Sequence, residues 1–254
     1  MRRILLFIAI FLYTLIFGLI AILLMIPIPN GNPLIWCARP WAAMILLTCG
    51  VRVRVTRNHR DLGQPAIYIT NHQSLFDVLA LIRALPGQYR IIAKKELFGI
   101  PVFGWALSMA GFIKLDRADR DQARASLGVA AARVRAGRSL VVFAEGTRSP
   151  DGRLLPFKKG GFVLAIESGT PVVPISISGS RAVLGRETLD IKRGTIDVVI
   201  GAPIATMALT YDDRNTLIAK TRLAIEDGFT PLHARDLLPS AGTPEQLPTI
   251  PEPE

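Results

Sequence analysis

The sequence contains few of the residues on which several common protein chemistries depend. Among its 254 residues there are two cysteines and three histidines, and aromatic residues make up only 7%. Both cysteines, Cys37 and Cys49, lie in an apolar segment, where we expect buried thiols in a reducing compartment. The three histidines are too scattered for the ligand spacing of a zinc site. We therefore expect neither a disulfide framework nor a metal centre.

Three widespread signatures are also missing from the chain. No serine lies in a Gly-x-Ser-x-Gly sequence, which excludes the usual nucleophile elbow of serine hydrolases. The phosphate loop of nucleotide-binding proteins is absent as well. The net charge of +10 would suit nucleic acid, but no RNA-binding signature, zinc-finger spacing or basic helix with heptads accompanies it. We expect no nucleic-acid partner.

Negative charge is missing from the first 60 residues, which hold seven arginines and no Asp or Glu. Most of the net charge of +10 therefore lies at this end of the chain. Each basic residue near an anionic lipid surface contributes about 1 kcal/mol of attraction. This distribution predicts an anionic membrane surface as a partner.

The same N-terminal region contains two apolar segments. Residues 4–26 are long enough to cross a hydrocarbon core of about 30 Å as a helix. A cleaved signal peptide is the alternative, but its apolar region would be only about 7–15 residues long. Residues 33–50 contain Arg39 and Pro40, which favours an interfacial or re-entrant helix with Arg39 reaching toward the membrane interface.

Arginines flank both outer ends of this pair of segments, and an uncharged proline-rich turn separates them. The pattern predicts a helical hairpin over residues 1–50, embedded from the cytoplasmic face of the cytoplasmic (inner) membrane. The alternative is a single span with an exported domain.

Beyond residue 50 the sequence predicts strands that alternate with helices. Amphipathic helices are expected over residues 123–134 and 217–225. Alternation of this kind predicts an α/β fold, a mostly parallel sheet with helices on both faces. We assign this catalytic domain to residues 51–230 and a proline-rich, disordered tail to residues 231–254. The expected strands are 51–55, 66–70, 89–93, 112–115, 140–143, 172–177 and 195–200.

The first candidate site motif, residues 71–77, follows one of these strands. It places His72 five residues before Asp77, so the carboxylate can turn back to hold one ring nitrogen and leave the other as a base. A structural interpretation is also open: His72 as a strand-end histidine, and Ser74 with Asp77 as a capping box at a helix start.

The second motif, residues 145–149, follows another apolar strand. Gly146 lets the backbone approach a ligand, and Arg148 can form paired hydrogen bonds with a phosphate. A base with an orienting acid, beside an arginine and exposed amides, suits acyl transfer to a hydroxyl near a phosphate.

Together these motifs resemble those of the glycerolipid acyltransferase family, most closely the bacterial 1-acylglycerol-3-phosphate acyltransferases. The likeness covers about residues 51–230 and departs from the usual pattern at Ala144, where proline is common, and at Lys114, where an apolar residue is common. Further matching blocks are residues 93–98, 100–105, 111–117 and 172–175.

The resemblance implies a role for each motif residue. His72 would deprotonate the acceptor hydroxyl and Asp77 would orient it. Lys94 would bind phosphate or stabilise the oxyanion, with Lys95 as the alternative. For Arg117 a salt bridge to Asp116 or Asp119 is the structural alternative. The residues implied in the phosphate pocket are Arg117, Arg148, Glu145, Gly146 and Thr147.

The implied reaction moves a fatty acyl group from an acyl thioester to the sn-2 hydroxyl of lysophosphatidic acid, making phosphatidic acid for phospholipid synthesis. Acyl-CoA or acyl-carrier protein would be the co-substrate, with no cofactor and no metal. One alternative acceptor is another lyso-lipid, such as a lyso-ornithine lipid or a lysophospholipid. Two other classes are a non-catalytic membrane lipid-binding module and a hydrolase in which His72 activates water.

Overall fold

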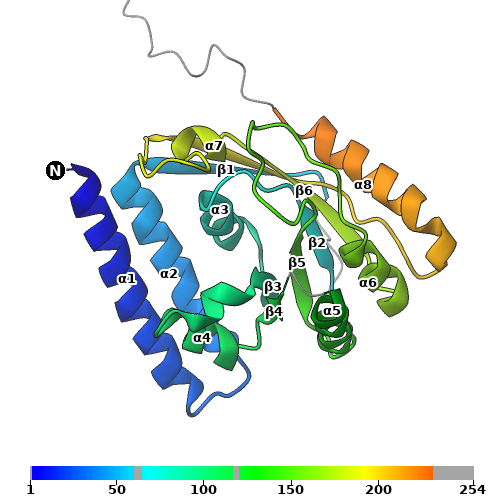
Figure 1. Ribbon diagram of the computed structural model, residues 1–254, viewed down its shortest axis with the longest axis horizontal. Helices are drawn as coiled ribbons and strands as arrows, with labels where there is room; N and C mark the ends of the chain where they lie inside the picture. Colours follow the sequence, from blue (N-terminus) through cyan, green and yellow to red (C-terminus); the bar gives the residue numbers. More distant parts are fainter. Residues whose placement is uncertain (1, 60–64, 117–119, 231–254) are drawn as a thin grey trace, which may run out of the picture.

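The structure is a computed structural model that describes residues 2–59, 65–116 and 120–230. Two N-terminal helices precede a twisted sheet that carries helices on both faces (Figure 1). The expected tail and Arg117 lie outside the described residues.

Within the described residues the sheet has seven strands, in the order β1-β7-β6-β2-β5-β3-β4. Each predicted strand is confirmed, with its ends within two residues of the expected positions. The strands are β1 Val51–Arg57, β2 Ile67–Thr70, β3 Tyr89–Lys94, β4 Ile113–Leu115, β5 Ser139–Phe143, β6 Val172–Ser178 and β7 Gly194–Ile200.

The sheet is mostly parallel, as predicted, because only the pair β6 and β7 is antiparallel. β1 pairs parallel to β7, so these two strands run opposite to the other five. Ser178, the last residue of β6, lies opposite Asp197, and Gly194 at the start of β7 lies opposite Val51. The beginning of β1 therefore lies at the edge where the five parallel strands end.

Helices cover both faces of the sheet, and the side chains of β2 show why. Ile67 and Ile69 pack toward one face and Tyr68 toward the other, and all three are fully buried. One face is covered by α5 Arg120–Arg135, α6 Gly160–Ser168 and α8 Arg214–Asp227, and the other by α3 Phe76–Ala84 with the short α7 Ser180–Val183. The expected helices at 123–134 and 217–225 lie inside α5 and α8. A short 3₁₀ turn, η2 Tyr211–Asp213, precedes α8.

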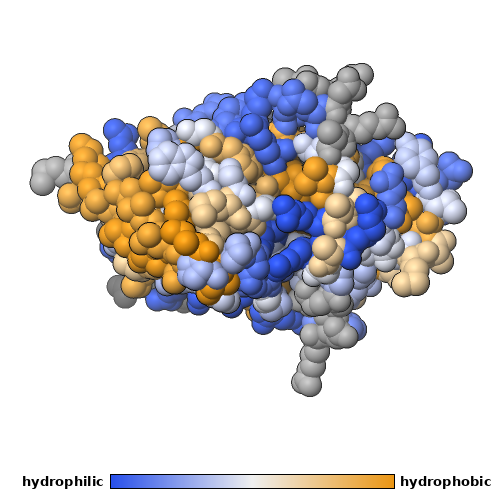
Figure 2. All heavy atoms as spheres, turned by 90° about the horizontal axis from the view of Figure 1, so that it is seen from below, coloured by the Kyte–Doolittle hydropathy of each residue, from blue (hydrophilic) through white to orange (hydrophobic). Residues whose placement is uncertain are grey.

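The N-terminal pair consists of α1 Arg2–Met25 and α2 Asn32–Cys49, packed side by side. By length and composition, α1 is the one helix among the described residues able to cross a membrane, and only 11% of its most apolar window is buried. Hydrophobic atoms therefore gather at the α1 end of the molecule (Figure 2). α2 differs, because Ile35, Ile45 and Leu46 are buried in the core that also contains α3.

Arg39, which we expected to reach toward the membrane interface, binds backbone carbonyl oxygens of the protein. It lies in the middle of α2, and its Nη2 donates to the carbonyl oxygens of Gly87 at 3.1 Å and Leu85 at 3.4 Å. Leu85 is the C-cap of α3, whose last carbonyl groups lack partners within the helix. The charge in the second apolar segment thus ties α2 to the sheet-bearing domain.

Candidate active site

His72 and Asp77 form the centre of the site. Nδ1 of His72 lies 2.8 Å from Oδ2 of Asp77, which also accepts the backbone N–H groups of Gln73 at 2.6 Å and Ser74 at 2.9 Å. An ionised carboxylate only accepts hydrogen bonds, so beside it a neutral imidazole carries its proton on Nδ1 and keeps the lone pair on Nε2. Asp77 is fully buried, while the His72 side chain stays slightly exposed. The pair has the arrangement of a base held by an orienting acid.

The capping-box interpretation is half right. The helix begins at Phe76 with Leu75 as its N-cap, so Ser74 is not the capping residue. Ser74 Oγ instead donates to the carbonyl of Leu184 at 2.7 Å and accepts from the N–H of Phe76 at 3.2 Å. Asp77 does accept the backbone N–H of Ser74. One carboxylate therefore fixes both the start of α3 and the imidazole.

Asn71 explains how the chain leaves the sheet just before His72. Its side-chain Nδ2 donates to the carbonyl of Ile177, and its Oδ1 accepts the N–H of Ile177, both at 2.8 Å. The side-chain amide therefore replaces the peptide group that would have continued the pairing of β2 with β6. The backbone of residues 72–75 is free to turn away while β6 keeps its hydrogen bonds.

Phe143 holds the imidazole from a second side. Its ring stacks on that of His72, with centroids 3.9 Å apart and planes inclined by 27°. Phe143 is the last residue of β5, and its register partner on β2 is Thr70. Sequence reasoning did not assign Phe143, although the neighbouring ends of two parallel strands could have indicated it.

Glu145 joins the two motifs. Its Oε1 accepts the backbone N–H of His72 at 2.9 Å and its Oε2 accepts that of Leu155 at 3.1 Å. In return the N–H of Ser149 donates to the carbonyl of His72 at 2.8 Å. Burial raises the pKa of Glu145 to about 7, although its two backbone hydrogen bonds lower it. With both oxygens bound to backbone, Glu145 fixes the loops that carry His72 and Arg148.

The exposure of the rest of the second motif differs from residue to residue, and Ser149 is fully buried. Gly146 has a positive φ of 69°, and Thr147 is exposed. Arg148 is half-buried, and no carboxylate among the described residues pairs with its guanidinium group. Arg186 donates to the carbonyl of Arg148 at 3.1 Å, and Arg181 donates to that of Ser149 at 3.2 Å. These two arginines concentrate positive charge at the loop, and no motif spacing in the sequence indicated them.

The two lysines at the end of β3 form ion pairs with acidic residues. Lys94 is exposed and pairs with Glu96 at 3.1 Å, whereas Lys95 pairs with Asp116. Asp116 was one of the two acids considered as a salt-bridge partner of Arg117, and in the structure it pairs with Lys95.

A cleft adjoins the ring of Phe143 and has a volume of about 370 Å³. Ala144, Gly146 and Lys158 line it together with apolar residues of β3, β4 and α5. The backbone N–H of Lys158 donates to the carbonyl of Ala144 at 2.7 Å, and its side chain passes over Gly146, where an added Cβ would lie 3.4 Å from Cγ of Lys158. Sequence reasoning missed Lys158, because its place in the cleft depends on this long-range hydrogen bond.

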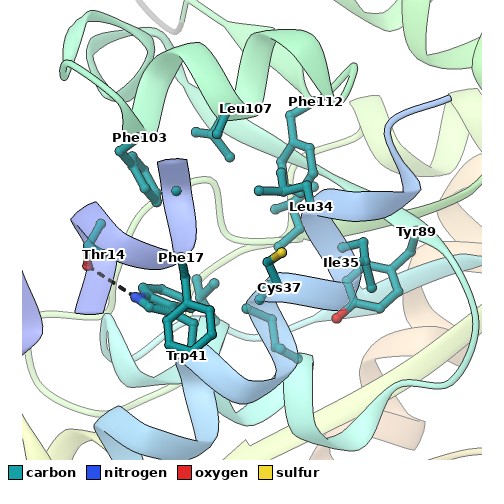
Figure 3. A pocket seen from close by; sticks show the side chains of 16 residues that line it. Thr14, Phe17, Leu34, Ile35, Cys37, Trp41, Tyr89, Phe103, Leu107 and Phe112 are labelled. Carbon is teal, nitrogen blue, oxygen red and sulfur yellow. Dashed lines mark hydrogen bonds between the residues drawn. The ribbon is translucent and has the colours of Figure 1, made fainter. Parts of the chain in front are cut away.

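A second, almost wholly apolar pocket lies between α1, α2, α3 and α4 Phe103–Met109 (Figure 3). Phe17, Leu34 and Leu107 project into it from three of these helices. At one side Trp41 Nε1 donates to Thr14 Oγ1 at 3.1 Å. Val78 and Ile82 of α3 line this pocket, which shares no lining residue with the cleft beside Phe143.

Comparisons with known proteins show which family the chain resembles. The family model described as Acyltransferase matches residues 50–178. A chloroplastic 1-acyl-sn-glycerol-3-phosphate acyltransferase of Brassica napus is 34% identical over 82% of this chain and 65% of its own length. A Saccharomyces cerevisiae protein of the same name is 34% identical over 85% of this chain and 74% of its own.

The fold also matches a solved structure. The crystal structure of the 1-acyl-sn-glycerophosphate (LPA) acyltransferase PlsC from Thermotoga maritima superposes with a TM-score of 0.76 at 24% identity, over 90% of this chain and 96% of that one. The chain spans from about half to three quarters of the length of the curated relatives it matches.

Proposed function

This chain belongs to the acyltransferase family, and from that premise we propose that it acylates the sn-2 hydroxyl of lysophosphatidic acid to make phosphatidic acid. The observation that carries the proposal is the His72–Asp77 pair, set beside Arg148, whose guanidinium group pairs with no carboxylate of the described residues, in a chain whose relatives are named for this reaction. The acyl donor is an acyl thioester, either acyl-CoA or acyl-carrier protein.

The proposed chemistry uses the lone pair on Nε2 of His72. Nε2 takes the proton of the acceptor hydroxyl while the hydroxyl oxygen attacks the carbonyl carbon of the thioester. The tetrahedral intermediate then collapses, the carbon–sulfur bond breaks, and the departing thiolate receives the proton from His72. Asp77 stabilises the transient imidazolium through the 2.8 Å contact to Nδ1. General-base catalysis of this kind contributes about 10²–10⁴-fold in rate. The scheme requires no metal and no organic cofactor.

The acceptor phosphate is assigned to the cationic side of the site. Arg148 offers paired donors to phosphate oxygens, and Lys158 adds a flexible ammonium group at the neighbouring cleft. Among the residues that the structure describes, no acidic residue lines that cleft. Arg117, which lies outside the described residues, keeps its proposed role in phosphate binding.

Attachment to the membrane is assigned to α1, whose exposed apolar side chains have no protein partner among the described residues. Because α2 is packed on α3, the catalytic domain stays next to the bilayer into which α1 inserts. We place this domain on the cytoplasmic face, where activated acyl donors are made.

The test is an assay of the purified full-length chain against a panel of lyso-acceptors, with acyl-CoA and acyl-carrier-protein donors in parallel. Lysophosphatidic acid should be acylated in preference to lysophosphatidylcholine and lyso-ornithine lipid, and His72→Ala should abolish transfer. Equal use of an acceptor without a phosphomonoester would refute lysophosphatidic acid as the substrate. Release of free fatty acid without any acceptor would indicate a hydrolase.

A further inference from the structure

A second apolar surface lies outside the N-terminal helices, on the segment after β3. Residues 97–109 contain no charged side chain, and they cover the end of the 3₁₀ turn η1 Lys95–Gly99 and the whole of α4. Four large hydrophobic side chains of this segment are exposed: Leu97 36%, Ile100 46%, Trp105 57% and Met109 45%. We call these four residues the α4 patch. A helix facing water would carry charged or polar residues on that side.

The segment that carries the α4 patch is fixed to α1. Val102 has a positive φ of 62°, and the N–H of Phe103 donates to the carbonyl of Pro101 at 2.7 Å, so Val102 is the centre of a tight γ-turn. Positive φ is costly for a β-branched residue. The turn presses Val102 against Gly18 of α1, where an added Cβ would lie 2.8 Å from Cγ1 of Val102.

The inner side of α4 is already occupied. Ala106 and Ala110 are buried against Ala21 and Met25 of α1, so the exposed side chains of α4 point away from the protein. The patch therefore continues the exposed apolar surface of α1 rather than forming an isolated hydrophobic spot.

The α4 patch also lies at the catalytic edge of the sheet. It follows the end of β3, which runs parallel to β5, and β5 ends at Phe143 against the ring of His72. Seen from below, hydrophobic atoms cover the α1 end of the molecule and extend toward its middle (Figure 2).

We propose that the α4 patch inserts into the interfacial region of the same lipid bilayer that receives α1. Trp105 is the expected anchor, because tryptophan prefers the level of the lipid head groups. With contacts from both α1 and α4 the catalytic domain cannot rotate about the α1 axis. The cleft beside Phe143 is then held facing the lipid surface. The inference extends the membrane attachment proposed above and does not depend on which lyso-lipid is the acceptor.

Fluorescence of Trp105 in reconstituted full-length protein tests the proposal directly. Trp36→Phe and Trp41→Phe leave Trp105 as the single tryptophan, and vesicles of phosphatidylethanolamine and phosphatidylglycerol contain lipids brominated on their acyl chains. We expect strong quenching of Trp105 by bromine and a loss of quenching by aqueous iodide. The matched control adds Trp105→Phe and Leu223→Trp, which places the fluorophore on the exposed face of α8, where bromine should have no effect.

Equal iodide quenching of Trp105 with and without vesicles would overturn the proposal. Protection from iodide without bromine quenching, together with crosslinks between copies, would assign the α4 patch to self-association instead and would also overturn it. A second readout is activity of Trp105→Lys. It should fall several-fold on vesicle-borne acceptor and stay unchanged on a dispersed short-chain acceptor. If the wild type acylates neither acceptor, the proposed function fails, but the quenching result still decides whether α4 contacts lipid.

Discussion

Replacing Asp77 by asparagine separates the catalytic role of this carboxylate from its structural role. Oδ2 of Asp77 accepts three N–H donors, one from the imidazole of His72 and two from backbone. Asparagine has the same shape and can present its carbonyl oxygen at the same point. Asparagine carries no charge, so it favours the Nδ1-protonated tautomer of His72 less strongly than aspartate does. It also does not stabilise the imidazolium.

The magnitudes follow from these contacts. A hydrogen bond to a charged group contributes about 1.5–3 kcal/mol and a neutral one about 0.5–1.5 kcal/mol, so three weakened bonds lower the free energy of unfolding by about 3–4.5 kcal/mol. The asparagine NH₂ would occupy the place of Oδ1, which is buried and has no hydrogen-bond partner among the described residues. The turnover rate should fall by about 10²–10⁴-fold, the range for loss of an oriented base.

The assay is a double-mutant cycle of His72→Ala, Asp77→Asn and the combined variant. Initial rates are measured with saturating donor and vesicle-borne lysophosphatidic acid, and thermal unfolding is followed in parallel. Because Asp77 acts through His72, Asp77→Asn should cost nothing further in the His72→Ala background.

Two results would refute this reasoning. Near-normal turnover by His72→Ala would remove the base from the mechanism. An equal loss from Asp77→Asn in both backgrounds would show that Asp77 acts on the fold alone, through the start of α3.

Further predictions concern the phosphate site, the buried acid and topology. Arg148→Ala should raise the KM for lysophosphatidic acid by about 10–100-fold, because a charge-assisted hydrogen bond contributes about 1.5–3 kcal/mol. The KM for the donor should not change, and the matched control Arg153→Ala should leave both KM values unchanged. Lys158→Ala should raise the same KM, whereas Lys159→Ala, which removes a neighbouring charge outside the cleft lining, should not. Burial raises the pKa of Glu145 from 4.5 to about 7, so the folded state holds the proton more tightly. Thermal stability should therefore fall as pH rises from 4.5 to 7, and Glu145→Gln should flatten that slope in melting curves. A cytoplasm-active reporter fused after Glu254 should function and a periplasm-active one should stay silent; the opposite pattern would mean an exported domain.

The fold could be predicted because each strand is short and either alternates between apolar and polar residues or forms an apolar run. The alternation that identifies β1 and the continuous apolar runs of β2 and β6 are local properties of the sequence. The antiparallel insertion of β7 could not be predicted, because strand order depends on pairings between residues far apart. Arg39 was misplaced for a related reason: its partners lie 46 and 48 residues away on the loop after α3.

The site could be predicted only where one motif carries both partners. His72 and Asp77 are five residues apart, so their contact follows from a single turn of chain. Phe143, Lys158 and Arg186 reach the site through the sheet and through loops, and no local spacing indicates them. Glu145 was expected among the groups shaping the phosphate pocket, and its carboxylate turns out to hold two backbone N–H groups.

The reversal of β1 and β7 determines how far a lipid must travel. A seven-residue strand is about 23 Å long at about 3.3 Å per residue. Had β1 run with the other strands, the chain would enter it from the far edge, and α2 would end about that distance from His72. With β1 reversed, α2 ends at the edge where His72 lies. In the proposed reaction, a lyso-lipid with its tail in the bilayer would have to raise only its head group to meet His72, and its hydrocarbon would not have to cross water.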